Sequence, residues 1–331
     1  MVVMQKGARN KISDVRGVSV GHYTVDTPTH HTGVTVILPC PEESEFIFTH
    51  KMPAAAVVLN GYGKSQGLVQ IQELGTLETP IALTNTLNVG RVHDALVEYM
   101  VRQAEKRGVE LRSVNPVVGE CNDASLNRIT ERVIGIPEVM SAIESAGADF
   151  EEGDVGAGKG TTCFGLKGGI GSASRVFQVG TERYTLGVLV QSNFGSTENL
   201  RIDGQPVGRR ILQEITPSAL DKGSIMIVMA TDLPASDRQL TRIIKRAGVG
   251  LARMGSYWGH GSGDIVIGFS TAQRISTEEQ AGTVPFRMLN EEYIDTVFQA
   301  MADATEEAVL RSMLQADAVG NRRSLKEFLQ K

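Results

Sequence analysis

The feature that most constrains the fold is the most apolar run of the chain, Ser224-Ile-Met-Ile-Val-Met-Ala. A short uncharged run that contains several β-branched residues predicts a strand buried inside the protein. The run follows Gly223, and glycine allows the backbone conformations that other residues avoid. If the peptide bond before Ser224 were cut, the serine would become a new N-terminus at the start of that strand. The run therefore suggests a self-processing hydrolase.

Other segments show how such a strand could be covered. Short β-rich runs between glycines predict strands at 33–38, 54–59 and 184–190. Apolar residues at helical spacing predict helices at 91–106, 239–254 and 291–315. Numerous strands with few but long helices favour an α+β class in which helices cover sheets. Because no Pro/Ser-rich linker and no internal repeat divides the chain, residues 1–331 are expected to form a single domain.

Composition excludes several classes of protein. The net charge of −5 comes from interspersed acidic and basic residues, which argues against a nucleic-acid partner. No stretch approaches the roughly 18 apolar residues of a membrane span, and the first residues lack the apolar core of a signal peptide. We therefore expect a cytoplasmic protein without a membrane partner.

Cysteines and histidines point to no metal or other cofactor. Cys40, Cys121 and Cys163 are odd in number and widely spaced, unlike a disulfide framework or a zinc cluster. The six histidines have no metal-ligand spacing. A catalytic thiol at Cys121 or Cys163 is an alternative to the ordinary role of a buried small side chain.

A glycine-rich segment at 153–162 resembles the opening of a phosphate-binding loop. It fits Gly-x4-Gly-Lys, with Lys159 in the lysine position, but Gly160 stands where the Mg²⁺-binding Ser or Thr normally lies. No apolar strand precedes it, and a strand-and-turn pattern follows instead of the helix that phosphates need. A nucleotide-binding enzyme is kept as an alternative, beside a glycine-rich turn with close backbone contacts.

A second short motif, Gly63-Lys-Ser65-Gln-Gly67, fits the nucleophile elbow of α/β-hydrolases. In such an elbow the strand runs directly into the first glycine, whereas here three residues intervene after the predicted strand. His260 is the one late histidine that could complete a triad. The elbow is a weaker candidate than Ser224.

The third candidate site combines Ser224 with Asn193 and with the pair Ser262 and Asp264. The α-amino group of an N-terminal serine has a pKa near about 8 and can itself act as the base that takes the hydroxyl proton. The amide of Asn193 could donate a hydrogen bond to a developing oxyanion, and Ser262 with Asp264 could orient the new ammonium. Alternatively, Ser224 only starts a strand and Asn193 only caps a turn.

Matching blocks along nearly the whole chain resemble the L-aminopeptidase/D-esterase family, which includes the β-peptidyl aminopeptidases. They include Asn60-Gly-Tyr-Gly63, Gln191-Ser-Asn-Phe-Gly195 and Gly261-Ser-Gly-Asp264, with further blocks at 12–22, 32–39, 84–86, 116–120, 167–171, 223–224 and 230–232. The resemblance implies a four-layer α/β/β/α sandwich like that of N-terminal-nucleophile hydrolases, with different connectivity. It also implies self-cleavage between Gly223 and Ser224 into chains 1–223 and 224–331 that stay associated, commonly as a homotetramer.

The resemblance also implies roles for particular residues in a serine aminopeptidase. Ser224 would be the nucleophile, Asn193 the oxyanion donor, and Ser262 with Asp264 the pair beside the new amino terminus. Glu120 would hold the free α-ammonium of a small peptide, amide or ester substrate, a contact that suits an aminopeptidase.

Two further residues near Glu120 or the expected pocket are candidates for substrate binding. Where several relatives carry Tyr two residues after this Glu, the chain has Asn122, which can donate a hydrogen bond but is no phenolic acid. Asn60 is expected at the pocket, or it only turns the chain there. Two alternatives remain: an uncleaved, non-catalytic binding module of the same fold, and an acyltransferase resembling ornithine acetyltransferases, which Ser224 disfavours because those use Thr.

Overall fold

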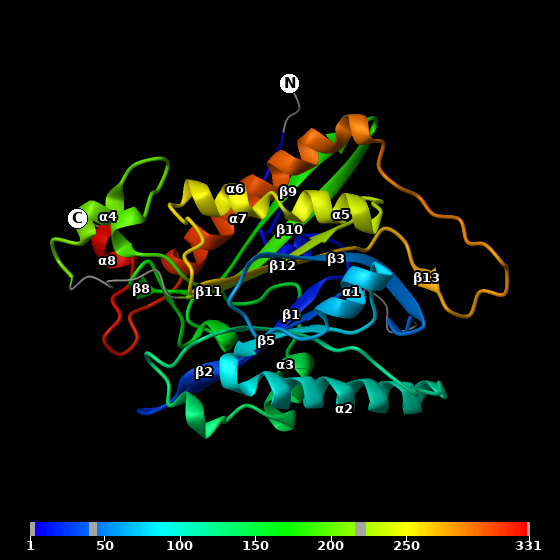
Figure 1. Ribbon diagram of the computed structural model, residues 1–331, viewed down its shortest axis with the longest axis horizontal. Coiled ribbons are helices and arrows are strands. Elements are labelled where there is room, and N and C mark those ends of the chain that lie inside the picture. Colours follow the sequence, from blue (N-terminus) through cyan, green and yellow to red (C-terminus); the bar gives the residue numbers. More distant parts are fainter. Residues whose placement is uncertain (1–3, 40–44, 216–222, 330–331) are drawn as a thin grey trace.

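The computed structural model describes residues 4–39, 45–215 and 223–329, and Cys40 lies outside them. It combines helices with two main β-sheets, which confirms the predicted α+β class (Figure 1). The larger sheet has the strand order β13-β3-β12-β11-β10-β9, with β4 added beside β3. Its strands are β3 (His50–Gly61), β4 (Thr76–Leu77), β9 (Gly169–Val179), β10 (Glu182–Asn193), β11 (Ser224–Thr231), β12 (Gly263–Ser270) and β13 (Ile275–Ser276).

The apolar run forms β11, a central strand of the larger sheet. All eight of its residues are buried, and it pairs antiparallel with β10 and parallel with β12. Ile225, Ile227 and Met229 belong to a core on one face of the sheet. Met226 and Val228 belong to a second core on the other face. The run is apolar throughout because both faces of this strand are covered.

The smaller sheet covers the inner face of the larger one. Its order is β1-β2-β5-β6, and it is formed by β1 (Ser19–Asp26), β2 (His31–Leu38), β5 (Ile81–Asn85) and β6 (Val117–Cys121). The core between the sheets joins Ile37 and Leu83 from the smaller sheet to Met226 from β11. The sheets approach closely at Gly119, where a Cβ would lie 2.5 Å from Met226. A separate two-stranded hairpin pairs β7 (Thr162–Cys163) with β8 (Leu166–Lys167).

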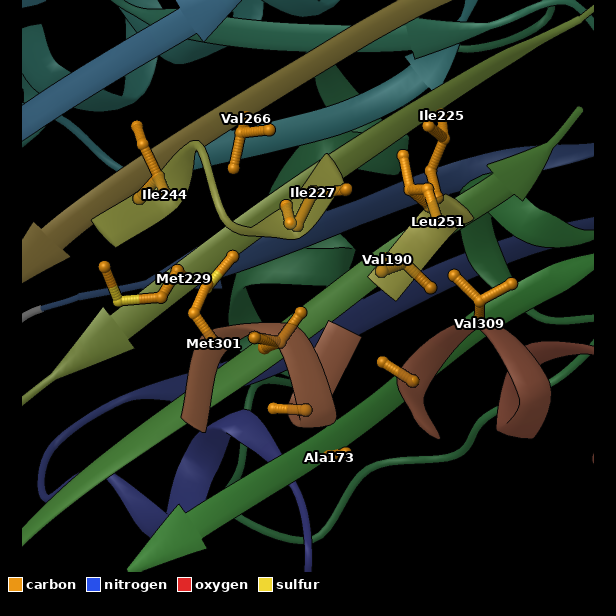
Figure 2. Close-up of a cluster of buried hydrophobic side chains, with 14 of the residues drawn as sticks. Ala173, Val190, Ile225, Ile227, Met229, Ile244, Leu251, Val266, Met301 and Val309 are labelled. Carbon is orange, nitrogen blue, oxygen red and sulfur yellow. The ribbon is translucent and has the colours of Figure 1, made fainter. Parts of the chain in front are cut away.

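Helices cover the outer faces of both sheets, as Figure 1 shows. The helices are α1 (Leu68–Leu74), α2 (Val89–Arg107), α3 (Ile136–Glu144), α4 (Val207–Ile211), α5 (Asp237–Ile244), α6 (Ala247–Arg253), α7 (Ile294–Leu314) and α8 (Lys326–Leu329). Helices α5, α6 and α7 pack on the larger sheet, and α2 and α3 pack on the smaller one. Met301 and Val309 of α7 belong to the same core cluster as Ala173 on β9 and Val190 on β10, and Figure 2 shows part of this cluster.

One predicted helix is in fact two. The apolar spacing over 239–254 predicted a continuous helix, but α5 ends at Ile244 and α6 begins at Ala247. Both halves still bury the apolar face, so the spacing alone did not reveal the break. Gly250 in α6 lies against α7, where a Cβ would be 2.6 Å from the Ala302 carbonyl oxygen. This close helix contact sets the direction of the second half.

The other predicted elements are confirmed, with bounds that differ by a few residues at their ends. The expected strands at 33–38, 54–59 and 184–190 lie within β2, β3 and β10, and the helices at 91–106 and 291–315 correspond to α2 and α7. Within the described ranges, none of the helices has both the length and the apolarity required to cross a bilayer.

Candidate active site

Three adjacent strands of the larger sheet bring the candidate residues together. Asn193, the last residue of β10, lies directly opposite Ser224, the first residue of β11. Directly opposed residues of antiparallel strands point to the same face of a sheet, so the two side chains are neighbours. On the other side, Ser224 is in register with Gly263 of β12, which in turn is in register with Gly61 of β3.

A cavity of about 720 Å³ opens beside Ser224, over the ends of these strands. Its lining residues come from both sheets and from the loops around them: Tyr62, Lys64, Thr86, Glu120, Asn122, Ser125, Thr162, Asn193, Gly223, Ser224, Tyr257, Gly259, His260, Gly261 and Arg322. A cavity of this size accommodates a small organic substrate.

Asn193 is held in one orientation by a backbone group. Its Oδ1 accepts a hydrogen bond from the Thr162 N–H at 2.9 Å. With the oxygen fixed in this way, the Nδ2 group points in the other direction within the amide plane, where it can donate to a ligand in the cavity. The amide is therefore oriented before a substrate arrives.

Ser262 and Asp264 form a buried pair at the start of β12. The Ser262 hydroxyl donates to Asp264 Oδ1 at 2.8 Å, and both residues are at most 1% exposed. Gly263 between them is the register partner of Ser224, so the pair lies next to the backbone of Ser224. A carboxylate in this place favours a positive charge nearby.

Asn60 holds the loop that carries this pair. Its Nδ2 donates to the carbonyl oxygens of Gly259 at 2.9 Å and Ser262 at 2.5 Å. The side chain is thus committed to the loop at 259–262, which contributes one wall of the cavity.

Glu120 projects into the cavity from the end of β6 and is only 2% exposed. Its Oε1 accepts from the Lys64 N–H at 3.0 Å, and its Oε2 accepts from the Thr86 hydroxyl. These two hydrogen bonds fix the direction of the carboxylate group. The group is therefore a preorganised anion facing the same space as Ser224.

Asn122 lines the cavity two residues after Glu120. Its Oδ1 accepts from the Ala124 N–H at 3.0 Å, so its own turn uses the oxygen. Because the oxygen is used in this way, its Nδ2 remains the donor that can face a ligand.

Several lining residues were not singled out as site residues from the sequence. Tyr62, Tyr257 and His260 form an aromatic rim, with the rings of Tyr62 and His260 6.3 Å apart. His260 had been weighed only as a partner for the alternative nucleophile. Arg322 comes from the turn before α8 and carried no sequence signal. Thr86 lies in a matched block and could have been found from it.

The peptide bond before Ser224 occupies a sterically demanding position. The Gly223 carbonyl oxygen accepts a hydrogen bond from the Gly263 N–H at 3.1 Å. A Cβ on Gly223 would lie 1.8 Å from the Asn193 carbonyl oxygen and 2.9 Å from Phe194 Cα. Only glycine therefore fits at this place without a movement of the backbone.

The thiols are poorly suited to act as nucleophiles. Burial, the largest cause, and the nearby Glu120 carboxylate raise the pKa of the Cys121 thiol well above its usual value. Cys163 is also buried. The reactive form of cysteine is the thiolate, which these surroundings disfavour at Cys121.

Two motif interpretations are wrong. The segment at 153–162 forms a buried turn around Gly156–Gly158 and then β7, not a helix, and Lys159 is ion-paired with Asp26 at 2.8 Å and Asp154 at 2.9 Å. The Lys159 ammonium is therefore bound by two carboxylates of the chain itself. The motif around Ser65 is no nucleophile elbow, because β3 ends at Gly61 and α1 begins only at Leu68.

Within the described residues, no group of three or more His, Cys, Asp and Glu side chains is arranged to hold a metal ion.

Comparison with known proteins identifies the family. The sequence profile of Peptidase family S58 matches residues 10–326. The chain belongs to peptidase family S58. It is 35% identical over 337 residues to a β-peptidyl aminopeptidase of Sphingosinicella microcystinivorans, covering 95% of this chain and 83% of that protein. This confirms the sequence-based resemblance and identifies an aminopeptidase-type hydrolase; nothing supports the nucleotide-binding alternative.

Solved structures agree over the same length. The crystal structure of the PH0078 protein from Pyrococcus horikoshii OT3 is 45% identical with a TM-score of 0.92, covering 99% of this chain and 95% of that one. The L-aminopeptidase D-Ala-esterase/amidase from Ochrobactrum anthropi is 34% identical with a TM-score of 0.90, covering 98% and 94%. That structure is described as a prototype for the serine aminopeptidases and a new variant of the Ntn hydrolase fold, which supports the fold expected for this chain.

Proposed function

We propose that this single-domain chain cleaves itself between Gly223 and Ser224 and then acts as a serine aminopeptidase. Cleavage gives chains 1–223 and 224–331. The observation that carries the proposal is the register of β10, β11 and β12, which puts Asn193, Ser224 and Gly263 side by side, with Asn193 and Ser224 lining the cavity. No other serine of the described residues combines a preceding sterically required glycine with this environment.

Self-cleavage begins with attack of the Ser224 hydroxyl on the Gly223 carbonyl carbon. The Oγ–C bond forms, the C–N bond to Ser224 breaks, and the hydroxyl proton passes to the departing nitrogen. The Gly263 N–H polarises this carbonyl from 3.1 Å. Water then hydrolyses the ester, which leaves a carboxylate on Gly223 and a free amino group on Ser224.

The new amino group supplies the base for substrate turnover. An α-amine titrates near about 8, so a useful fraction is neutral at physiological pH and can accept the Ser224 hydroxyl proton. The buried pair of Ser262 and Asp264 lies beside this nitrogen and stabilises its protonated form. Asn193 Nδ2 donates to the oxyanion of the tetrahedral intermediate, and the resulting acyl-enzyme is hydrolysed by water.

Glu120 selects substrates with a free amino group. A single preorganised carboxylate in the cavity binds the α-ammonium through charge-assisted hydrogen bonds and thereby positions the carbonyl over Ser224. The substrates are small peptides, amides or esters. Asn122 contributes a second, uncharged donor at this end of the cavity, and Asn60 keeps the loop at 259–262 in place.

The assembled protein is proposed to be a cytoplasmic homo-oligomer, a tetramer by family resemblance. Exposed apolar side chains support an association surface, since Val58 on β3 is 46% exposed and Trp258, in the loop between α6 and β12, is 38% exposed. Light scattering after gel filtration measures the assembly, and cell fractionation measures the location.

Intact-mass measurement tests the central step. Purified wild-type protein should give two fragments, and the smaller one should begin Ser-Ile-Met-Ile-Val. Ser224→Ala should give one uncut chain that is inactive toward aminoacyl p-nitroanilides. Uncut wild-type protein without hydrolase activity would instead favour a non-catalytic binding module of this fold.

A further inference from the structure

Arg322 is a cation on the cavity wall that the proposed mechanism does not use. Its side chain lines the cavity over Ser224, and its Nε is buried without a hydrogen-bond partner among the described residues. Its Nη1 donates to the Gly165 carbonyl oxygen at a long distance of 3.5 Å. A guanidinium has five donors, so one held this way still has donors to offer to a ligand.

The backbone around Arg322 is held firmly on the Asn193 side of the cavity. Its N–H donates to the Val319 carbonyl oxygen at 3.0 Å, and the Arg323 carbonyl oxygen accepts from the Lys167 N–H at 2.9 Å. Lys167 belongs to β8, which pairs with the strand whose Thr162 N–H fixes Asn193. Arg322 is therefore built into the framework that supports the oxyanion donor.

The charged groups around Glu120 show which end of the cavity would bind the ammonium of a substrate. Glu120 attracts the ammonium, and Lys64 lies at the same end because its backbone N–H binds Glu120. The Lys64 ammonium lies over the Tyr62 ring at 4.4 Å. Arg322, by contrast, belongs to the turn that is hydrogen-bonded to the β7–β8 hairpin on the Asn193 side.

The size of the cavity matches a molecule of two residues. A volume of about 720 Å³ corresponds to roughly 9 Å in each direction, and two extended residues span roughly 7 Å. With its ammonium on Glu120 and its first carbonyl over Ser224, a dipeptide would end near the opposite wall. Its free carboxylate carries the charge and the planar geometry that a guanidinium binds best.

We propose that Arg322 binds the C-terminal carboxylate of the leaving residue, so that this protein prefers dipeptides with a free carboxylate. The inference rests on the proposed function, since it assumes that Glu120 and Ser224 take the roles given above. It adds a determinant of substrate length, because a longer peptide or a C-terminal amide cannot present a carboxylate at this place.

A matched pair of substrates tests the proposal. The aminoacyl group that the wild type cleaves fastest from p-nitroaniline is joined to alanine and, separately, to alaninamide. We expect the wild type to favour the free acid, and Arg322→Gln to lower kcat/KM for the acid about 10- to 100-fold, mainly through KM. Turnover of the amide and self-cleavage should change less than about threefold, and Arg322→Lys should restore part of the preference.

Control variants and a binding measurement separate this inference from the function it rests on. Arg323→Gln, whose parent side chain is paired with Glu327 at 2.8 Å, should leave the acid-to-amide ratio unchanged. A ratio altered by Lys64→Gln but not by Arg322→Gln would overturn the assignment, as would equal losses on both substrates. Calorimetric titration of uncut Ser224→Ala with the acid and with the amide measures binding without turnover. We expect Ser224→Ala to bind the acid more tightly than the amide, and Ser224→Ala/Arg322→Gln to lose this preference. Equal binding of the two ligands by Ser224→Ala, or a preference kept in the double variant, would also overturn the assignment.

Discussion

Replacement of Gly223 by alanine tests whether the geometry before Ser224 controls self-cleavage. The added Cβ would lie 1.8 Å from the Asn193 carbonyl oxygen, whereas real Cβ contacts stay beyond 3.0 Å. The backbone must therefore move by at least about 1.2 Å, and a displacement of about 1 Å at reacting atoms can cost about 100-fold in rate. We expect Gly223→Ala to slow fragment formation by about that factor or more.

The assay follows the uncut chain by intact mass from the earliest time after expression. Gly282→Ala is the matched control, because a Cβ there meets nothing within 4 Å and its cleavage should match the wild type. Any fraction of Gly223→Ala that does become cut should turn over substrate normally, because residue 223 is then a chain end that can move away. Fragment formation at the wild-type rate would refute the steric reasoning.

The other predictions concern catalysis and pH. Asn193→Ala should lower kcat about 100- to 1000-fold with little change in KM, as loss of one oxyanion donor does, and an unchanged kcat in steady-state assays would exclude this role. Glu120→Gln should lower kcat/KM for substrates with a free amine about 10- to 100-fold, whereas equal activity would show that the ammonium binds elsewhere. Burial lowers the pKa of His22 from 6.5 to about 4, so the unfolded chain binds this proton at a higher pH than the folded one. The free energy of unfolding should therefore fall by about 3 kcal/mol as pH drops from 6.5 to 4, and urea titrations of His22→Asn should lack this part of the decrease.

The sequence was most informative at positions where a structural requirement can be met by only one kind of residue. An uncharged run with β-branched residues predicted β11, since both faces of that strand are buried. Glycine before Ser224 marked a place where a side chain cannot fit. The order of matched blocks predicted which distant residues share a site, and the structure brings Glu120, Asn193 and Ser224 to one cavity.

What the sequence did not reveal depends on contacts between distant segments. The break between α5 and α6 leaves the apolar spacing intact, and Gly250 after the break lies close to α7, which the local sequence does not reveal. The glycine-rich segment at 153–162 resembles a phosphate loop in its sequence. In the structure, however, its Lys159 is ion-paired with Asp26, more than a hundred residues away. Arg322 reaches the cavity because its turn hydrogen-bonds to β8, and its local sequence carries no trace of that contact.

The strand order of the larger sheet has a consequence for the proposed fragments. Strands β11, β12 and β13 come from residues after Ser224, and β3, β9 and β10 come from residues before it, with β3 lying between β13 and β12. The two fragments are therefore interleaved, and three separate ladders of backbone hydrogen bonds cross from one to the other. Neither half could be made alone without exposing unpaired strand edges that invite aggregation. On this proposal the enzyme is synthesised as one polypeptide and cut afterwards, so that the uncut chain serves as its own assembly template.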